Sequence, residues 1–515
     1  MSRHFRLRIL SIPLALLVAS PVLAAPADDR AITEAAGKSL REFVEFLHIP
    51  NVREKSAADM RRNADWLVAA FKRHGLRSEL MADGDIPWVF AEVPGASKAK
   101  KTVLFYAHMD GQAVFAKDWD QPDPFVPILK EKGADGKYAA LSLDRLFEAS
   151  PNPEWRVFAR SSADDKAPIM MLMAAVDALK TAGKQPAINI KVIIDPREEG
   201  GPPTIKDVIA RNLDRLKADA VAMLDGPMHP SNKPTIVFGN RGGSVFDLTV
   251  FASRYELHSG HYGNYAPNPV FGLGHLLASM KDADGRVQIP GFYDGVDMTP
   301  AFKQVLAAVP EDEAALRERL GIAQSEKVGD NYQETLNYPT LNVTALKAGE
   351  PGSGRSIIPA FATASFDMRT VPGTPQPRQL GLIREWVKQQ GYHLIDGETP
   401  TEQERRTYPR LAAITGSSRG GEALMTPLDA PVGLWAQAAL RKAFNAEPIR
   451  IPIMGGGVPS GPLADGLRIP ILLIPLVNSD NNQHAANENL RVGNYFSGVK
   501  SLYHLLREPL PPGRN

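Results

Sequence analysis

The hydrophobic pattern of the chain alternates between two kinds of segment. Short apolar runs rich in β-branched residues, typical of buried strands, cover residues 102–107, 188–194, 220–224 and 469–476. Apolar residues at helical spacing predict helices over residues 31–74, 167–182 and 205–216. Because strands and helices alternate along the chain, the pattern predicts an α/β domain with a mixed sheet and helices on both of its faces.

A second pattern begins at residue 242. Residues 244–252 and 361–370 alternate between apolar and polar positions, as half-exposed strands do, and a helical run at 270–280 lies between them. The Val-Pro-Gly sequence ending at Gly373 marks the point where the chain leaves this second region, and a further helix is predicted at 383–390. The pattern therefore predicts a smaller α+β domain that interrupts the first one.

These boundaries divide the chain into four parts. We expect a leader at residues 1–25, the first part of the large domain at 26–241, the inserted domain at 242–373 and the second part of the large domain at 374–515. Two stretches dense in Pro, Gly and charge are predicted as irregular surface loops, at residues 118–138 and 399–428.

The first 25 residues have the features of a secretory signal peptide. Arg3, Arg6 and Arg8 precede a short apolar run, and small residues follow at a cleavage site. The run is too short to span a bilayer comfortably, although a membrane anchor is the alternative. We expect a secreted or periplasmic protein that has no membrane contact once the signal is cleaved.

The amino-acid composition limits the kinds of site and of binding partner that the protein can have. The chain has no Cys, which excludes a disulfide framework and a thiolate zinc site. Without the three arginines of the leader, the net charge changes from +1 to −2, a balance that provides no electrostatic footprint for nucleic acid or an anionic membrane. We therefore expect neither as a partner.

Side chains that can bind metal stand next to the predicted strands and helices. Each has an ordinary structural explanation when taken alone, such as a solvated turn, a helix cap or a structural histidine. Together they place two His and three carboxylates where ligands gather in open α/β sheets, and such sets build two-metal sites for zinc, manganese or cobalt. The five candidate ligands are His108, Asp164, Glu199, Asp225 and His484.

Two neighbours of these ligands suggest further roles. Asp110 can accept the second ring proton of His108 and so fix its tautomer. Glu198 and Glu199 are adjacent at a strand end and point in different directions, which suits one metal ligand and one proton carrier. Paired carboxylates repel each other, so keeping both ionised implies a nearby cation.

In their order along the chain, the strings AHMD, DDK, EEGG and LHSG resemble the zinc metallopeptidase family of carnosinase, aminoacylase, glutamate carboxypeptidase and desuccinylase. The resemblance extends from His108 to His484 and implies two divalent ions, zinc or else manganese or cobalt. It implies Asp164 as the bridging ligand, His108 and Asp225 in one metal site, and Glu199 and His484 in the other. It also implies that Glu198 is the general base for a metal-activated water and that Asp110 orients His108.

The resemblance implies roles for residues of the inserted domain as well. That domain would be a lid that forms a homodimer, with His258 reaching the neighbouring active site to stabilise the oxyanion; a surface-loop histidine is the alternative. Arg369 resembles an arginine that binds a substrate carboxylate. Asn268 follows the family pattern after the lid histidine, and Gly456 lies in a Gly-rich turn like one near the substrate, although a plain loop is equally possible.

The chain departs from the family pattern around Asp164. Arg160-Ser161-Ser162 and Ala167 stand where the family usually has Gly-Arg-Gly and Gly, which implies a different backbone approach there. The segment at 120–161 is also longer than usual, so we expect a remodelled pocket mouth.

The pattern as a whole favours an exported two-metal hydrolase of peptide or amide bonds in small substrates, of dipeptidase or carboxypeptidase type. An N-acyl amino acid deacylase is one alternative, because the residue set does not separate the two. An inactive exported binding protein is the other, although a binding protein has no use for the general base Glu198.

Overall fold

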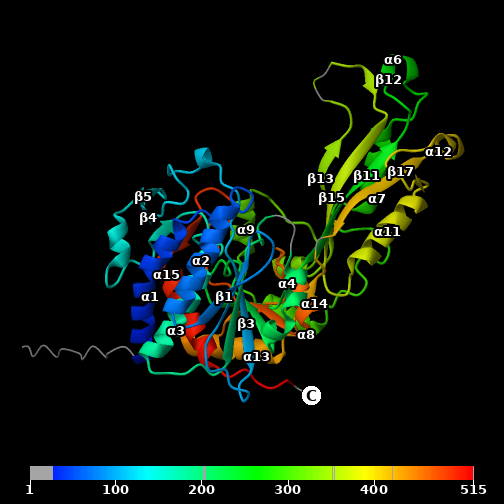
Figure 1. The fold of residues 1–515 in the computed structure, drawn as a ribbon. Helices are drawn as coiled ribbons and strands as arrows, with labels where there is room; N and C mark the ends of the chain where they lie inside the picture. Colours follow the sequence, from blue (N-terminus) through cyan, green and yellow to red (C-terminus); the bar gives the residue numbers. More distant parts are fainter. Residues whose placement is uncertain (1–26, 201–203, 351, 353, 420, 514–515) are drawn as a thin grey trace, which may run out of the picture.

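The computed structural model describes residues 27–200, 204–350, 352, 354–419 and 421–513. The predicted signal peptide at 1–25 lies outside the described residues. The chain forms a large domain and a smaller second domain that projects away from it (Figure 1). Within the described ranges, no helix is long and apolar enough to cross a membrane.

The large domain is built on an eight-stranded mixed sheet. Strands β7, β3, β8 and β20 are parallel to one another, whereas β1, β2 and β9 run antiparallel to at least one neighbour. In spatial order, the strands are β1 (Arg77–Met81), β2 (Trp88–Glu92), β7 (Asn189–Asp195), β3 (Thr102–His108), β8 (Ala220–Met223), β20 (Ile471–Leu473), β9 (Thr235–Val237) and β19 (Ile449–Ile451).

Helices cover both faces of this sheet because its central strands are apolar on both sides. Val103 and Phe105 of β3 belong to one buried cluster, and Leu104 and Tyr106 belong to another. The first cluster packs under α1 (Ala27–Leu47), α2 (Ala57–Arg73), α3 (Lys166–Thr181), α13 (Pro431–Phe444) and α15 (Val492–Arg507). The second packs under α4 (Ile205–Arg211), α5 (Leu213–Leu216) and α14 (Ser460–Leu467). The predicted α/β class is confirmed.

The helix predicted over residues 31–74 is in fact two helices. Pro50 lies in the connection, where a residue without a backbone N–H cannot continue a helix. The second helix begins at a Ser56 cap, whose side chain accepts a hydrogen bond from the Asp59 N–H. The loop between the helices lies next to the candidate site, because Asn51 donates to the carbonyl of Met109 at 2.8 Å.

The second domain is a five-stranded sheet with helices on one face. The alternation predicted at 361–370 is confirmed: Phe366 and Met368 are buried with the helices, whereas Asp367 and Arg369 lie on the open face. In spatial order the strands are β13 (Thr340–Lys347), β15 (Phe361–Thr370), β11 (Gly242–Phe251), β17 (Leu411–Arg419) and β16 (His393–Leu394). The helices over the buried face are α7 (Pro269–Met280) and α11 (Gln376–Gln389).

The boundary predicted at Gly373 is too early. Strand β17 pairs antiparallel with β11, and α11 packs its Ile383 and Val387 into the core of the second domain. The second domain therefore extends to about residue 419. The stretch at 399–428 was wrongly predicted as an irregular loop, because its Pro, Gly and charged residues surround β17 and the short helix α12 (Glu402–Thr407).

The other predicted loop, at 118–138, also contains regular structure. It contributes β4 (Ile128–Lys132) to a four-stranded sheet that covers one edge of the large domain. The remaining strands of that sheet are β5 (Tyr138–Ala140), β6 (Arg156–Phe158) and β21 (Asn489–Arg491). Because β6 pairs with β21, the segment before Asp164 lies beside the segment after His484.

Short elements complete the chain. Strands β10 (Gly239–Asn240) and β18 (Leu424–Met425) pair where the chain enters and leaves the second domain, and β12 (Leu257–His258) pairs with β14 (Ile357–Ile358) at that domain's far end (Figure 1). The short helices are α6 (Ser259–Tyr262), α8 (Pro300–Ala307), α9 (Glu313–Leu320) and α10 (Tyr332–Leu336).

Candidate metal centre

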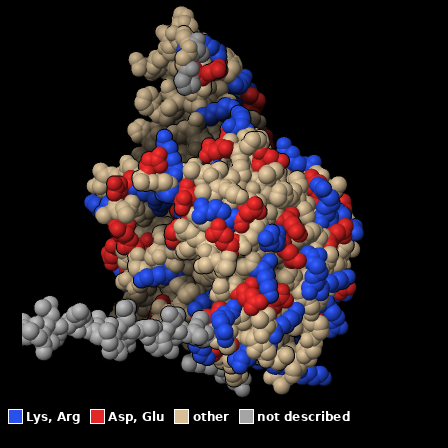
Figure 2. All heavy atoms as spheres, turned by 90° about the vertical axis from the view of Figure 1, so that its left-hand side faces the viewer, with Lys and Arg blue, Asp and Glu red and all other residues tan. Residues whose placement is uncertain are grey.

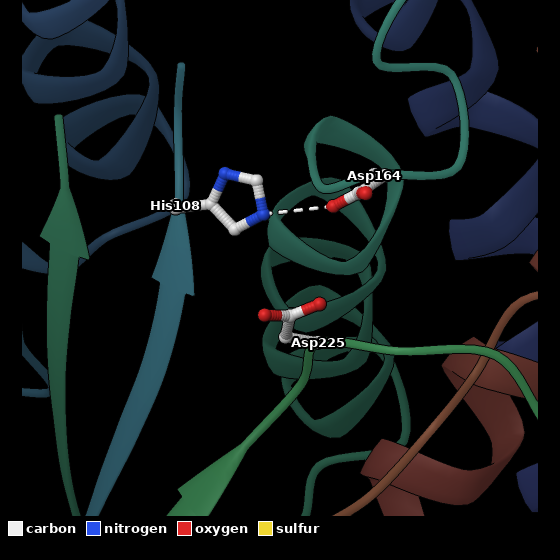
Figure 3. Close-up of side chains that lie close together, drawn as sticks. All are labelled: His108, Asp164 and Asp225. Atoms are coloured by element: carbon white, nitrogen blue, oxygen red, sulfur yellow. Dashed lines mark hydrogen bonds and ion pairs between the residues drawn. The ribbon is translucent and has the colours of Figure 1, made fainter. Parts of the chain in front are cut away.

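Parallel strands bring the candidate ligands to one edge of the large sheet. His108 is the last residue of β3, Asp225 follows the neighbouring β8, and Glu198 and Glu199 follow β7 on the other side. Figure 3 shows His108 and Asp225 at adjacent strand ends, with Asp164 opposite them at the start of α3. This is the edge at which open α/β sheets bind their ligands.

Asp164 lies between two histidines. One of its carboxylate oxygens, Oδ1, is 2.8 Å from Nε2 of His108, and the other, Oδ2, is 3.2 Å from Nε2 of His484. His484 also lies 3.3 Å from Oε2 of Glu199. One carboxylate that presents a separate oxygen to each histidine has the arrangement of a bridging ligand.

The five predicted ligands form two overlapping groups. His108, Asp164 and Asp225 are one group, and Asp164, Glu199 and His484 are another; in each, the potential ligand atoms lie within 4.8 Å of one another. Glu198 joins a third group with His108 and Glu199. Asp164 is common to the first two groups, as a two-metal site requires.

Asp110 hydrogen-bonds both to His108 and to the turn that carries Glu198 and Glu199. Nδ1 of His108 donates to the backbone carbonyl of Asp110 at 3.1 Å, which leaves Nε2 facing Asp164. The Asp110 carboxylate accepts the N–H groups of Glu198 at 3.1 Å and Glu199 at 2.9 Å. The predicted partner of His108 therefore also fixes the turn that carries the two glutamates.

The charges of the site suit divalent cations. Burial, together with neighbouring carboxylates, raises the pKa of Asp225 to about 7 and that of Glu198 to about 9. Hydrogen bonds to Asp164 and Glu199 raise the pKa of His484 to about 10. A cation among these side chains would offset the excess negative charge, and oxygen and imidazole ligands without sulfur fit zinc, manganese or cobalt.

Two buried carboxylates next to the ligands received no predicted role. Asp195 ends β7, accepts from the Tyr106 hydroxyl at 2.9 Å and accepts from the Arg197 N–H at 2.8 Å. Asp165 accepts from the backbone N–H of His108 at 3.2 Å. Their signal was their position inside the DPREEGG and DDK strings, but neither type nor spacing distinguishes such a support from a solvated turn.

The Lys of the DDK string stabilises the fold next to the candidate metal ligands and is not one of them. Lys166 is fully buried, and its Nζ donates to the carbonyls of Phe46 at 2.8 Å and Ile49 at 2.7 Å. Burial lowers its pKa well below the usual value. It therefore joins the start of α3 to the end of α1.

Gln112 is another neighbour of the ligands that the sequence analysis missed. Its side-chain amide donates a hydrogen bond to Oε2 of Glu199 at 2.8 Å.

Within a single chain, four predicted site residues do not join the five candidate metal ligands. Three of them belong to the second domain and one to the Gly-rich turn. His258 is exposed at the far end of the second domain, where its Nδ1 accepts from the Gly260 N–H (Figure 1). Asn268 caps α7 by accepting from the Val270 N–H. Arg369 pairs with Asp367 on the open face of the second domain at 3.1 Å. Gly456 lies in an exposed loop before α14.

The charged side chains of one face of the large domain are mixed in sign. On the face shown in Figure 2, Lys and Arg side chains are interspersed with Asp and Glu side chains over the large domain.

Comparison with known proteins agrees with the geometry of the site. The model of peptidase family M20/M25/M40 matches residues 104–508. The chain is 26% identical over 455 residues to a Cys-Gly metallodipeptidase of Schizosaccharomyces pombe, an alignment that covers 85% of this chain and 88% of the relative. It is 27% identical over 424 residues to the human Beta-Ala-His dipeptidase, covering 80% of this chain and 76% of the relative.

Solved structures show the same fold. An M20 family metallo-carboxypeptidase from Sulfolobus solfataricus superposes with a TM-score of 0.69 at 25% identity, covering 91% of this chain and 98% of that structure. Human carnosine dipeptidase 1 superposes with a TM-score of 0.67 at 22% identity, covering 93% and 97%.

Proposed function

This chain belongs to peptidase family M20/M25/M40, and from that premise we propose that it is an exported two-metal dipeptidase. Membership confirms the family resemblance predicted from the motifs and makes the chain a hydrolase that acts on peptide bonds. Dipeptidase is the subclass we favour over carboxypeptidase and N-acyl amino acid deacylase, because the two curated relatives described above are both named dipeptidases.

One observation carries the proposal: two groups of potential ligands, each able to hold an ion, share Asp164, and Glu198 lies beside them in a third group with His108 and Glu199. We assign one ion to His108, Asp164 and Asp225, and the other to Asp164, Glu199 and His484. Two ions held there would lower the pKa of a water molecule and polarise the scissile carbonyl.

Glu198 is the proton carrier in this proposal. It is adjacent to the ligand Glu199, and its backbone is fixed by Asp110 at 3.1 Å. Its carboxylate takes a proton from the attacking water and delivers it to the leaving amine, so it acts as base and then as acid. Nearby cations would lower the raised pKa of Glu198 and keep the carboxylate ionised, as the first step requires.

The remaining roles require the second domain. Arg369 lies on the open face of that domain, where its Nε pairs with Asp367, and we assign its guanidinium to the terminal carboxylate of a peptide, which it would bind in bidentate form. His258 belongs to β12, at the end of the second domain that points away from the large domain (Figure 1). We therefore assign it to the cage of a second subunit in a homodimer, where its imidazole donates to the oxyanion.

Export is the part of the proposal that rests on sequence alone. The arginines, apolar run and small residues of the first 25 positions support it. Expression of the full-length chain in a Gram-negative host, followed by fractionation and N-terminal sequencing, tests it. A periplasmic product that begins near residue 26 is expected, and a cytoplasmic product with an intact N-terminus would contradict export.

Hydrolysis of a mixed substrate panel tests the activity. Mature protein loaded with zinc, manganese or cobalt is incubated with dipeptides, longer peptides and N-acyl amino acids, with and without a chelator. We expect metal-dependent cleavage of dipeptides. Preference for N-acyl amino acids would replace the dipeptidase assignment by the deacylase one, and metal binding without any cleavage would favour a binding protein.

A further inference from the structure

A buried glutamate lies directly behind the candidate metal centre. Glu488 is four residues after His484, and its side chain is fully buried. Its Oε2 accepts from Nη1 of Arg160 at 2.7 Å and from the Ser161 N–H at 2.8 Å. Its Oε1 accepts from the N–H groups of Ala163 and Asp164, each at 2.9 Å. These four donors use the roughly four acceptor sites that a carboxylate offers.

The backbone around Asp164 depends on these bonds. α3 begins after Asp165 without any side-chain cap. The N–H groups of Ser161, Ala163 and Asp164 are buried in front of that helix and would lack partners without the glutamate, a costly state for backbone donors. Glu488 thus supplies, from a distant loop, the acceptors for three N–H groups of the turn that precedes the helix.

Ser161, one of the residues at which the chain departs from the family pattern, fits this arrangement. Ser161 has a φ of 60°, a left-handed conformation that favours glycine. Its hydroxyl accepts from Asn51 at 2.9 Å and fills the space next to Gly111, where a Cβ would come within 2.3 Å of that oxygen. The strained residue is therefore held on one side by Asn51 and on the other by Glu488.

The same glutamate joins two loops that each carry a ligand. Arg160, its ion-pair partner, donates through Nη2 to the carbonyl of Ala485 at 3.1 Å, next to His484. The Ala159 N–H donates to the backbone carbonyl of Glu488 at 3.2 Å. The loop with Asp164 and the loop with His484 are thus connected behind the point where the two ligands approach each other.

We propose that Glu488 is a positioning residue for the metal centre, which fixes Asp164 and His484 relative to each other through Arg160 and three backbone N–H groups. The inference rests on the proposed two-metal function and deepens it. Residues that hydrogen-bond to metal ligands without binding the metal themselves typically contribute about 10- to 100-fold in metal affinity.

Metal affinity of the Glu488→Gln variant tests the proposal. The amide nitrogen of Gln cannot accept the two hydrogen bonds that one carboxylate oxygen accepts, so the Asp164 segment should loosen while the shape of the side chain is kept. We expect the affinity for zinc, measured at 25 °C by competition with a chromophoric chelator, to fall by about 10- to 100-fold. Hydrogen exchange of the metal-free variant should increase at residues 159–165 and 484–488.

Glu334→Gln is the matched control. Glu334 is equally buried, accepts the Asp330 N–H at 3.1 Å and pairs with Lys303, but it belongs to α10 and is outside the three ligand groups. Its loss should lower stability and leave metal affinity at the wild-type value. A folded Glu488→Gln protein that binds two ions with wild-type affinity would overturn the proposal.

Three further outcomes are decisive. If Glu488→Gln does not fold, Arg160→Lys replaces it: this variant keeps a cation beside Glu488 but loses the link to Ala485, so weaker metal binding supports the proposal and unchanged binding refutes it. If the wild-type protein binds metal but cleaves nothing, the proposed function fails while the affinity comparison stands. If it binds no metal, unchanged hydrogen exchange in the two loops of the variant refutes the positioning role.

Discussion

The candidate functional residues of the two domains differ in burial and in hydrogen bonding. At the metal centre, His108 and Asp110 are fully buried, and each has partners at hydrogen-bonding distance within the same chain. In the second domain, His258 is exposed, and large apolar side chains that follow it in the sequence are exposed as well, such as Tyr265 at 87% and Phe271 at 70% exposure.

This difference indicates how the two regions reach their working geometry. Buried, mutually bonded side chains are positioned by folding alone, because each has one set of partners and one place. Exposed aromatic side chains in the same region as an exposed histidine are typical of a surface that works in contact with another molecule. The large domain should therefore control the metals and the proton carrier, and the second domain should act through assembly.

Removal of the proton carrier should have the largest effect. Glu198→Gln is expected to lower kcat by about 10²- to 10⁴-fold, because proton transfer by a positioned side chain contributes that much. Two metal ions per chain should remain bound, since Glu198 is not among the five assigned ligands. Steady-state kinetics and metal analysis of the same preparation check this. Near-wild-type turnover would remove Glu198 from the role of base.

Loss of the second-domain histidine should cost somewhat less. His258→Ala is expected to lower kcat by about 10²- to 10³-fold, the usual effect of removing one oxyanion donor, with metal content unchanged. Mixing this variant with Glu198→Gln tests the action across subunits, because a mixed dimer contains one site with both residues. Activity should rise above that of either variant after exchange of subunits. Mixtures that stay inactive would contradict a role in the neighbouring site.

An exposed aromatic residue on α7 should control assembly. Phe271→Glu places a charge on the outward face of that helix and should raise the dimer Kd by about 10- to 100-fold, as truncation of an interface hot spot does. Analytical ultracentrifugation over a concentration series measures it, and activity should fall in parallel. Leu213→Glu is the matched control, since Leu213 is 48% exposed on the large domain. Equal effects of the two changes would place the interface elsewhere.

The smallest effect concerns a buried histidine, His74, that joins α1, α2 and α3. His74 is buried between Asp177 at 2.5 Å and Glu42 at 2.7 Å, and hydrogen bonds to both raise its pKa to about 9 despite the opposing effect of burial. Because the folded-state pKa exceeds the unfolded value of about 6.5, the stabilisation is complete below pH 6.5 and is lost as the pH rises towards 9.

The His74→Gln variant isolates this contribution. Wild-type protein should be more stable than the variant by about 1–3 kcal/mol at pH 6, and the difference should shrink by pH 9.5. Urea unfolding followed by circular dichroism at the two pH values measures it. A difference that does not change with pH would show that His74 contributes by packing rather than by charge.

Much of the metal centre could be predicted from sequence because its information is local. His108, Asp225 and the Glu198–Glu199 pair each stand directly after an apolar strand, and parallel strands end at one edge of a sheet. The alternation of β15 likewise predicted which side chains are buried, because side chains of a strand point to opposite faces in turn. In both cases a few neighbouring residues contain the whole signal.

Other features depended on partners far away in the chain. Strand β17 belongs to the second domain only because it pairs with β11, more than 150 residues earlier, and its own surroundings are rich in turn-forming residues. Glu488 is indistinguishable from a solvated acidic residue until its four donors are known. The remote position of His258 depends on the length and direction of the second domain, which no local pattern expresses.

The sequence by itself determined the ligand types, their order and the strands that precede them, since residue type and short-range periodicity set these. Only the tertiary structure decided how closely the two histidines approach Asp164, where the second domain ends and which residues support the ligands from behind. Those properties are distances between segments that folding brings together, and such distances depend on the packing of the whole chain.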